Sequence, residues 1–285
     1  MLQRSVPDTL ACPACGGLTR QRLLYRKHGC AILRCEGCGL GRTETAGFDP
    51  ATYYTDGYFS GEHADGYADY RGAEPVLRRE FARTVDFIRR FRNHGRLIEA
   101  GCAYGFFLAE AAHHYDVAGI EIAEDAAAFC RSRGLDVVTG VVEPATLDRL
   151  GTPDAVVMLD VIEHLPAPDD TLSLIAERLA PGGIVVLTTG DFGSAVARLA
   201  GGGWRLMTPP QHLWFFTVES LHRLAAAHGL VVAHVDHPWK IVPASLILHQ
   251  LGRMTGLGAR TVPAASRLGL PVNLFDAIRV VLRKP

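Results

Sequence analysis

Four cysteines near the start of the chain have the spacing of a metal site. Cys12 and Cys15 enclose two residues in "CPACGG", and Cys35 and Cys38 do the same in "CEGCGL". Nineteen residues separate the two pairs, a spacing typical of a structural zinc site with two knuckles. Four thiolates would close the coordination sphere of Zn²⁺, so we expect this site to stabilise a fold and to perform no chemistry.

A second group of residues suited to ligand binding lies in "LIEAGCAYGFFLAEAA", from Leu97 to Ala112. Small residues at Gly101, Ala103 and Gly105 follow an apolar strand pattern and precede a helical one. Such a turn after the first strand of a parallel sheet is where nucleotide-like ligands bind. The dinucleotide pattern G-x-G-x-x-G is absent, and so is the Lys-Ser/Thr pair of a phosphate-binding loop.

Alternating strand and helix patterns surround this turn. Apolar strand patterns recur at 96–101, 117–122, 136–140, 154–161, 184–190, 230–237 and 277–284. Helical patterns lie at 74–91, 106–114, 124–134, 143–150, 169–180 and 217–229, the last with Thr217 as its N-cap. Continuous apolar strands that alternate with helices predict a parallel sheet covered on both faces.

The acid-x-Gly-x-small-x-Gly pattern resembles the first motif of class I S-adenosylmethionine-dependent methyltransferases. "GIEIAED", "LDVIEHLP" and "LAPGGIVVLTT" resemble later motifs of the same family, in the same order. The resemblance spans about residues 75–238 and the final strand. It implies a Rossmann-like α/β fold with a seven-stranded methyltransferase sheet, mostly parallel with an antiparallel last strand. Ala103 departs from the family pattern, where glycine is commoner, and we expect only a slightly tighter turn.

The cysteine segment resembles a zinc ribbon, and "PPQHLWFFTVESL" resembles a subgroup that carries such a module at its N-terminus. That subgroup contains methyltransferases of sugars and other natural products. We therefore expect a zinc ribbon at 1–45, a Tyr-rich linker or lid with a helix at 46–92, and a methyltransferase domain at 93–285. An acceptor-side insertion is expected at about 239–274.

The resemblance also implies roles for individual residues. Glu99 would reach the methionine end of the cofactor, Glu121 the ribose hydroxyls, and Tyr70 would close the site from the linker. Further cofactor contacts are implied for Gly101, Cys102, Ala103, Tyr104, Gly105, Ile122, Gly140, Val141, Asp160 and Val161. His212 is the first candidate for a general base and His164 the second. Each has a competing structural role, His164 as a brace of its loop and His212 as a core histidine.

The composition and charge of the chain bear on its location, its acceptor and the alternative functions. The chain has 285 residues, a net charge of −1 and no apolar run long enough to cross a membrane, so we expect a cytoplasmic protein with reduced thiols. We expect S-adenosylmethionine and structural Zn²⁺ as cofactors and a small-molecule acceptor, with carbon or oxygen methylation. One alternative is an RNA or ribosome methyltransferase, because residues 1–45 carry a net charge of +4. The other is a non-catalytic adaptor that only binds the cofactor.

Overall fold

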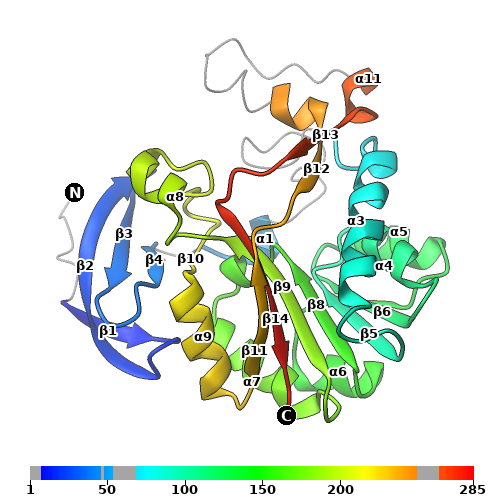
Figure 1. Ribbon diagram of the computed structural model, residues 1–285, viewed down its shortest axis with the longest axis horizontal. Coiled ribbons are helices and arrows are strands. Elements are labelled where there is room, and N and C mark those ends of the chain that lie inside the picture. Colours follow the sequence, from blue (N-terminus) through cyan, green and yellow to red (C-terminus); the bar gives the residue numbers. More distant parts are fainter. Residues whose placement is uncertain (1–7, 46–47, 54–68, 249–262) are drawn as a thin grey trace. The chain divides into compact units, whose positions relative to one another are not determined.

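The computed structural model describes residues 8–45, 48–53, 69–248 and 263–285 (Figure 1). Its contacts divide the chain into two compact units. The first comprises Met1–Pro50, Met158–Pro238 and Leu274–Pro285, and the second comprises Ala51–Val157 and Trp239–Asn273. The domain boundaries expected from the sequence, near residues 45 and 92, stay predictions.

An antiparallel sheet of five strands contains the cysteine segment, in the order β1-β2-β3-β4-β10. Its strands are β1 (Thr9–Cys12), β2 (Gly17–Lys27), β3 (Cys30–Cys35), β4 (Gly41–Glu44) and β10 (Trp214–Phe215). Strands β2 and β3 pair antiparallel between the two cysteine pairs, as the resemblance to a zinc ribbon implies. The fifth strand comes from a part of the chain about 170 residues further on, and the sequence did not indicate it.

A mixed sheet of seven strands has the order β11-β14-β9-β8-β5-β6-β7. Its strands are β5 (Arg96–Ala100), β6 (Asp116–Glu121), β7 (Val137–Thr139), β8 (Ala155–Leu159), β9 (Ile184–Gly190), β11 (Val231–Asp236) and β14 (Ala277–Arg283). Strand β5 runs parallel to β6 and β8, and β6 runs parallel to β7. The last strand, β14, is antiparallel to both β9 and β11. The predicted methyltransferase sheet is therefore confirmed.

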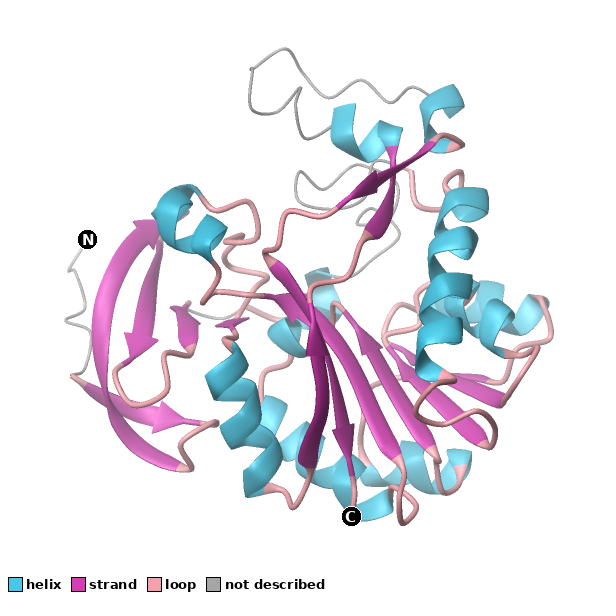
Figure 2. Cartoon of the chain, viewed as in Figure 1, coloured by secondary structure: helices cyan, strands magenta, loops and turns pink. Residues whose placement is uncertain are grey.

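The helices follow the predicted alternation (Figure 2). They are α1 (Pro50–Tyr53), α3 (Glu74–Ile88), α4 (Phe106–Ala111), α5 (Glu124–Ser132), α6 (Pro144–Leu150), α7 (Pro168–Arg178), α8 (Ala195–Ala200), α9 (Val218–Ala227) and α11 (Pro263–Ser266), with 3₁₀ turns η1 (Ile162–His164) and η2 (Gly201–Gly203). Helix α9 begins at a capping box, in which the Thr217 hydroxyl accepts from the Ser220 amide and the Ser220 hydroxyl accepts from the Thr217 amide. The predicted N-cap is thus confirmed.

The expected insertion contains strands as well as a helix. Strands β12 (Lys240–Pro243) and β13 (Gly269–Val272) pair antiparallel. The Ile241 amide donates to Glu80 of α3 over 2.6 Å, which ties β12 to that helix. Much of the Tyr-rich linker, 54–68, and the middle of the insertion, 249–262, lie outside the described residues. None of the helices in the described ranges combines the length and apolar character that a membrane crossing requires.

Candidate functional site

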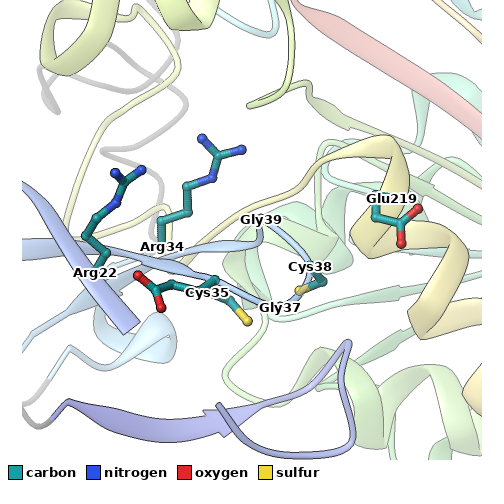
Figure 3. Close-up of a pocket in the computed structure, with 8 residues that line it drawn as sticks. Arg22, Arg34, Cys35, Gly37, Cys38, Gly39 and Glu219 are labelled. Carbon is teal, nitrogen blue, oxygen red and sulfur yellow. The ribbon is translucent and has the colours of Figure 1, made fainter. Parts of the chain in front are cut away.

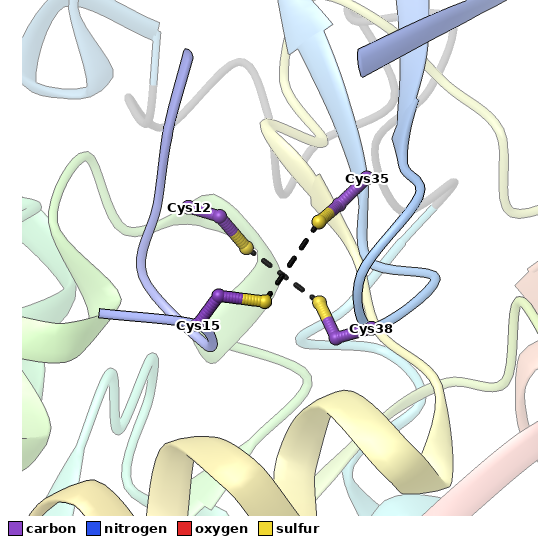
Figure 4. A group of neighbouring side chains, drawn as sticks. All are labelled: Cys12, Cys15, Cys35 and Cys38. Atoms are coloured by element: carbon purple, nitrogen blue, oxygen red, sulfur yellow. Dashed lines mark hydrogen bonds between the residues drawn. The ribbon is translucent and has the colours of Figure 1, made fainter. Parts of the chain in front are cut away.

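The four predicted cysteine ligands converge in the first unit (Figure 4). All four sulfurs lie within 4.8 Å of one another, with Cys12 and Cys38 3.6 Å apart and Cys15 and Cys35 3.9 Å apart. Four thiolates around a tetrahedral Zn²⁺, each at about 2.3 Å, would be separated by roughly 3.8 Å. A hydrogen bond from Cys38 lowers the pKa of Cys12 to about 5, which favours the thiolate that a metal needs. The cluster therefore has the geometry of a Cys₄ zinc site.

Glycines give the turns of the two knuckles a left-handed backbone. Gly16 and Gly39, each directly after the second cysteine of its pair, have φ values of 68° and 77°. Their amides donate to the carbonyls of Cys12 and Cys35. This left-handed backbone is open to glycine without steric cost, so the turns close tightly around the sulfurs.

The cysteine sheet is bonded to the segment that carries His212. Strand β10 pairs with β4, with Trp214 opposite Arg42 and Phe215 opposite Gly41. The Thr43 hydroxyl donates to the carbonyl of His212 over 2.6 Å, and the Thr43 amide donates to that of Leu213. The ring nitrogen Nδ1 of His28 lies 3.1 Å from the Pro209 carbonyl. The cysteine sheet thus fixes the backbone on both sides of His212.

A shared apolar core reinforces this attachment. Ile32 of β3 packs with Phe192, Ala197, Trp204, Met207 and Phe215, and each of these six side chains is buried. Because the core joins residues from the cysteine sheet with residues from 192–215, the two segments cannot separate without exposing apolar surface.

A pocket of about 440 Å³ lies beside the second cysteine pair (Figure 3). Its lining includes Arg22 and Arg34 but also the acids Glu36 and Glu219. Two guanidinium groups could attract an anion, whereas the two carboxylates would repel it. The pocket therefore lacks the single sign of charge that favours the binding of a polyanion such as RNA.

In the second unit, the turn after β5 has a left-handed backbone at three positions. Gly101, Ala103 and Gly105 have φ values of 74°, 46° and 70°. A Cβ atom at Gly105 would lie 2.6 Å from Leu135 and 2.9 Å from Cys130, so only glycine is accommodated there. Ala103 adopts a left-handed conformation in which an L-residue is strained, and this explains why glycine is commoner at that position.

Two carboxylates end adjacent strands beside this turn. Glu121 is 4% exposed and accepts hydrogen bonds from the amides of Ala103 (2.7 Å) and Ala123 (2.9 Å). Burial raises the pKa of Glu121, and the backbone hydrogen bonds oppose that increase. A carboxylate has about four acceptor positions, so two hydroxyl groups could still bind.

Glu99 has fewer side-chain hydrogen bonds than Glu121 in the described part of the chain. It is 3% exposed, and its Oε2 has no hydrogen-bond partner among the described residues. Burial, with the charges of Cys130 and Glu121, raises the pKa of Glu99 well above its usual value. A buried oxygen without a partner is costly, so this position suits a ligand that supplies a donor, and an ammonium group would supply one with a positive charge. This supports the fit of the predicted methionine end.

Aromatic side chains pack around the same turn. Tyr70 stacks on Phe106 at 5.5 Å between ring centroids and lies 5.9 Å from Tyr104. The Gly140 amide donates to the carbonyl of Glu121 at the end of β6, and Val141 next to it is 51% exposed. The structure thus brings Tyr70, Tyr104 and Gly140 to the neighbourhood of the two acids. Cys102, like Cys30 and Cys130, is buried as expected.

The remaining predicted cofactor residues lie directly after strands β6 and β8. Ile122 follows β6 directly, and Asp160 and Val161 follow β8. Asp160 has a φ of 57°, and its carboxylate accepts a hydrogen bond from Thr188 over 2.8 Å. A left-handed aspartate at the end of a strand is the kind of local strain that occurs at functional sites. The cofactor contacts of these residues stay predictions.

The two predicted catalytic histidines lie together in the first unit. The rings of His164 and His212 are 4.6 Å apart between centroids, at 76°. Nδ1 of His164 lies 3.0 Å from the carbonyl of Gln211, and Nδ1 of His212 lies 2.7 Å from that of Leu206. Since a carbonyl can only accept, Nδ1 carries the hydrogen in both rings and Nε2 carries the lone pair. Burial lowers the pKa of His164 to about 4 and that of His212 to about 3, so both are neutral at pH 7.

Sequence reasoning missed one histidine contact. Nε2 of His237 lies 3.1 Å from Oδ2 of Asp191, which is buried at the end of β9. The other oxygen of Asp191 accepts from the Gly193 amide. The sequence did not indicate this contact, because 46 residues separate His237 from Asp191 and no local pattern links them.

Comparison with known proteins decides the family. A model of the methyltransferase domain matches residues 73–235, which is more than half of the chain. The chain belongs to the methyltransferase domain family. The predicted resemblance is therefore confirmed for the domain, while its sugar and natural-product subgroup stays a prediction.

Relatives and solved structures agree with this assignment. Ubiquinone biosynthesis O-methyltransferases of Bordetella avium and Hydrogenovibrio crunogenus are 31% and 28% identical over 33% and 37% of the chain. The matched segments span only 42% and 47% of those two proteins. A chain in the complex of the Haloferax volcanii Trm112 methyltransferase activator with a methyltransferase has a TM-score of 0.52 and 14% identity. That match covers 84% of this chain and all of the other, and it shows the fold alone.

Proposed function

We propose that this protein transfers the methyl group of S-adenosylmethionine to a small-molecule acceptor. The observation that supports this best is the pair of buried acids, Glu99 and Glu121, at the ends of adjacent parallel strands beside a left-handed turn. Two carboxylates suit a ligand that has an ammonium group and ribose hydroxyls. The chain also belongs to the methyltransferase domain family.

The residues of the second unit would hold the cofactor. Glu99 would pair with its ammonium group, and Glu121 would accept hydrogen bonds from the ribose hydroxyls. The backbone from Gly101 to Gly105 would follow the methionine portion, and Val141 would pack on the adenine. When bound, the sulfonium supplies a methyl group that is already activated for in-line displacement. The protein then needs only to align the nucleophile and to exclude water.

The acceptor needs a group that prepares its nucleophile. His212 is our first candidate and His164 the second, because a neutral imidazole with its lone pair on Nε2 can accept a proton. Apolar residues around His212, such as Leu206 and Trp214, suit an acceptor with an apolar face. Within this class we propose a sugar-nucleotide or natural-product intermediate, methylated on carbon or oxygen. A reducing, cytoplasmic location would keep the seven free thiols reduced.

Two alternatives remain open to test. An RNA or ribosome methyltransferase would use the basic N-terminal segment, but the mixed charges around the pocket beside Cys38 weigh against it. An adaptor without activity would bind the cofactor but would not transfer its methyl group. RNA binding that weakens steeply with salt would favour the first, and cofactor binding without methyl transfer would favour the second.

Calorimetry with S-adenosylmethionine tests the cofactor site. Glu121→Ala should weaken binding by at least tenfold, because it removes the acceptor of two charge-assisted hydrogen bonds. Glu124→Ala, which removes an exposed acid three residues away, is the matched control and should bind as the wild type does. Equal affinity of Glu121→Ala and the control would refute the ribose assignment. Incubation with sugar nucleotides and other metabolites, followed by mass spectrometry for a gain of one methylene, then tests methyl transfer.

A further inference from the structure

A second set of potential metal ligands lies in the first unit, apart from the cysteines. Glu163, His164 and His212 each offer one donor atom, and these three atoms lie within 4.8 Å of one another. Two imidazoles and one carboxylate form a donor set that binds late first-row divalent cations and leaves coordination positions open.

The three side chains are held together by backbone hydrogen bonds. Glu163 and His164 belong to η1, and the Leu213 amide, next to His212, donates to the Glu163 carbonyl over 2.9 Å. The Trp214 indole donates to the Leu165 carbonyl over 2.9 Å. These contacts fix η1 against the segment that carries His212, so the donor atoms are close before any ion binds.

Both rings have the tautomer that metal-bound histidines commonly have. Each Nδ1 donates to a backbone carbonyl, of Gln211 for His164 and of Leu206 for His212. Such a hydrogen bond commonly orients a metal ligand, because it fixes the tautomer with the lone pair on Nε2.

A small cavity also lies beside two of these three residues. A cavity of about 10 Å³ is lined by both Glu163 and His212, and Leu206, Trp214 and Phe215 are among its apolar walls. That volume is about the size of one water molecule. Donor atoms that share one ion at about 2.1 Å lie roughly 3–4 Å apart, so a shift of about an ångström would complete the coordination.

We propose that Glu163, His164 and His212 bind a divalent cation of the zinc, iron, cobalt or manganese class, as a second metal site distinct from the four cysteines. The site itself does not depend on the proposed methyl transfer. Only its use rests on that function. An ion with open positions would bind an acceptor hydroxyl and lower the pKa of that hydroxyl, and His212 would then hold the ion and not the acceptor's proton.

Metal content tests the proposal without any acceptor. Protein produced in zinc-depleted medium with added Co²⁺, purified without chelators and dialysed against metal-free buffer, should retain about two Co²⁺ equivalents per chain by mass spectrometry. Co²⁺ bound by four thiolates gives intense charge-transfer absorption, whereas Co²⁺ bound by nitrogen and oxygen gives only weak ligand-field bands. Cys35→Ser should lose the first signal and keep the second.

The variants Glu163→Gln and His212→Ala should each reduce the content to about one equivalent and leave the charge-transfer absorption of the cysteine-bound Co²⁺ unchanged. His222→Ala, which removes an exposed histidine on α9, is the control and should keep both equivalents. Circular dichroism and retention of the cysteine-bound Co²⁺ verify that the variants are folded, and Glu163→Gln preserves side-chain size. One equivalent in the wild type, or two in a folded Glu163→Gln, would overturn the proposal. Either result would leave the cofactor site at Glu99 and Glu121 unaffected.

Discussion

Replacing Gly41 by alanine should weaken the attachment of the cysteine sheet to the segment that carries His212. Gly41 lies in β4, directly opposite Phe215 of β10. An added Cβ would be 2.8 Å from the Cβ of Phe215 and 2.9 Å from Cε1 of Phe192. Carbon atoms in contact prefer about 3.5–4.0 Å, so the backbone or both rings must move by roughly an ångström.

The size of the effect follows from the rigidity of this core. Phe192 and Phe215 are 6% and 2% exposed and pack against Trp204, so neither ring can turn aside into solvent. Overpacking of this kind costs about 1–3 kcal/mol. In a chain of this size, each kcal/mol lowers the melting temperature by about 2–4 °C.

Gly17→Ala provides the matched control on the same sheet. A Cβ at Gly17 would meet no described atom within 4 Å, and its φ lies outside the left-handed region. Its effect on the free energy of unfolding should stay within about 0.5 kcal/mol. Thermal unfolding followed by circular dichroism, with zinc content measured in parallel, compares the two variants. If Gly41→Ala unfolds at the same temperature as Gly17→Ala, the pairing of β4 with β10 does not stabilise the protein.

Two further predictions concern Glu99 at the proposed cofactor site and the four-cysteine cluster. Burial raises the pKa of Glu99 in the folded state. Protonated Glu99 therefore contributes stability that is fully present below the unfolded-state pKa of about 4.3 and is lost as the pH rises through the folded-state pKa. Glu99→Gln should therefore raise the free energy of unfolding of the ligand-free protein at pH 7.5, and this gain should disappear near pH 4. Urea unfolding at both pH values measures it, and an equal gain at the two pH values would contradict the raised pKa. Cys35→Ser should lose about one zinc per chain and several kcal/mol of stability in the N-terminal sheet, since structural zinc contributes folding free energy directly. Unchanged zinc content by mass spectrometry would count against the Cys₄ site.

The features that local patterns encode were predicted from the sequence. The spacing of Cys12, Cys15, Cys35 and Cys38 sufficed for the cluster, because two knuckles on a β-ribbon bring four sulfurs together without help from the rest of the chain. The parallel strands were visible as apolar runs, and Glu99 and Glu121 could be placed because the carboxyl ends of adjacent parallel strands meet at one edge.

The features that depend on distant parts of the chain were missed. Strand β10 has two residues, Trp214 and Phe215, too few to show any periodicity, and its partner β4 lies about 170 residues earlier. The contact between His237 and Asp191 and the grouping of Glu163 with His212 arise in the same way. Each joins side chains whose neighbours in sequence give no sign of the other, so only the folded chain shows them.

The pairing of β4 with β10 also sets an order for folding during synthesis. At about 5–20 residues per second, the ribosome adds β10 roughly 10–30 s after β4, whereas helices and hairpins form within microseconds. The edge of β4 in the nascent N-terminal sheet therefore stays unpaired during this time, and the cysteines can bind a metal before β10 is synthesised. In this order a metal-bound ribbon would be the surface on which β10 pairs, and loss of the metal would then also weaken the attachment of this later segment, which contains no cysteine.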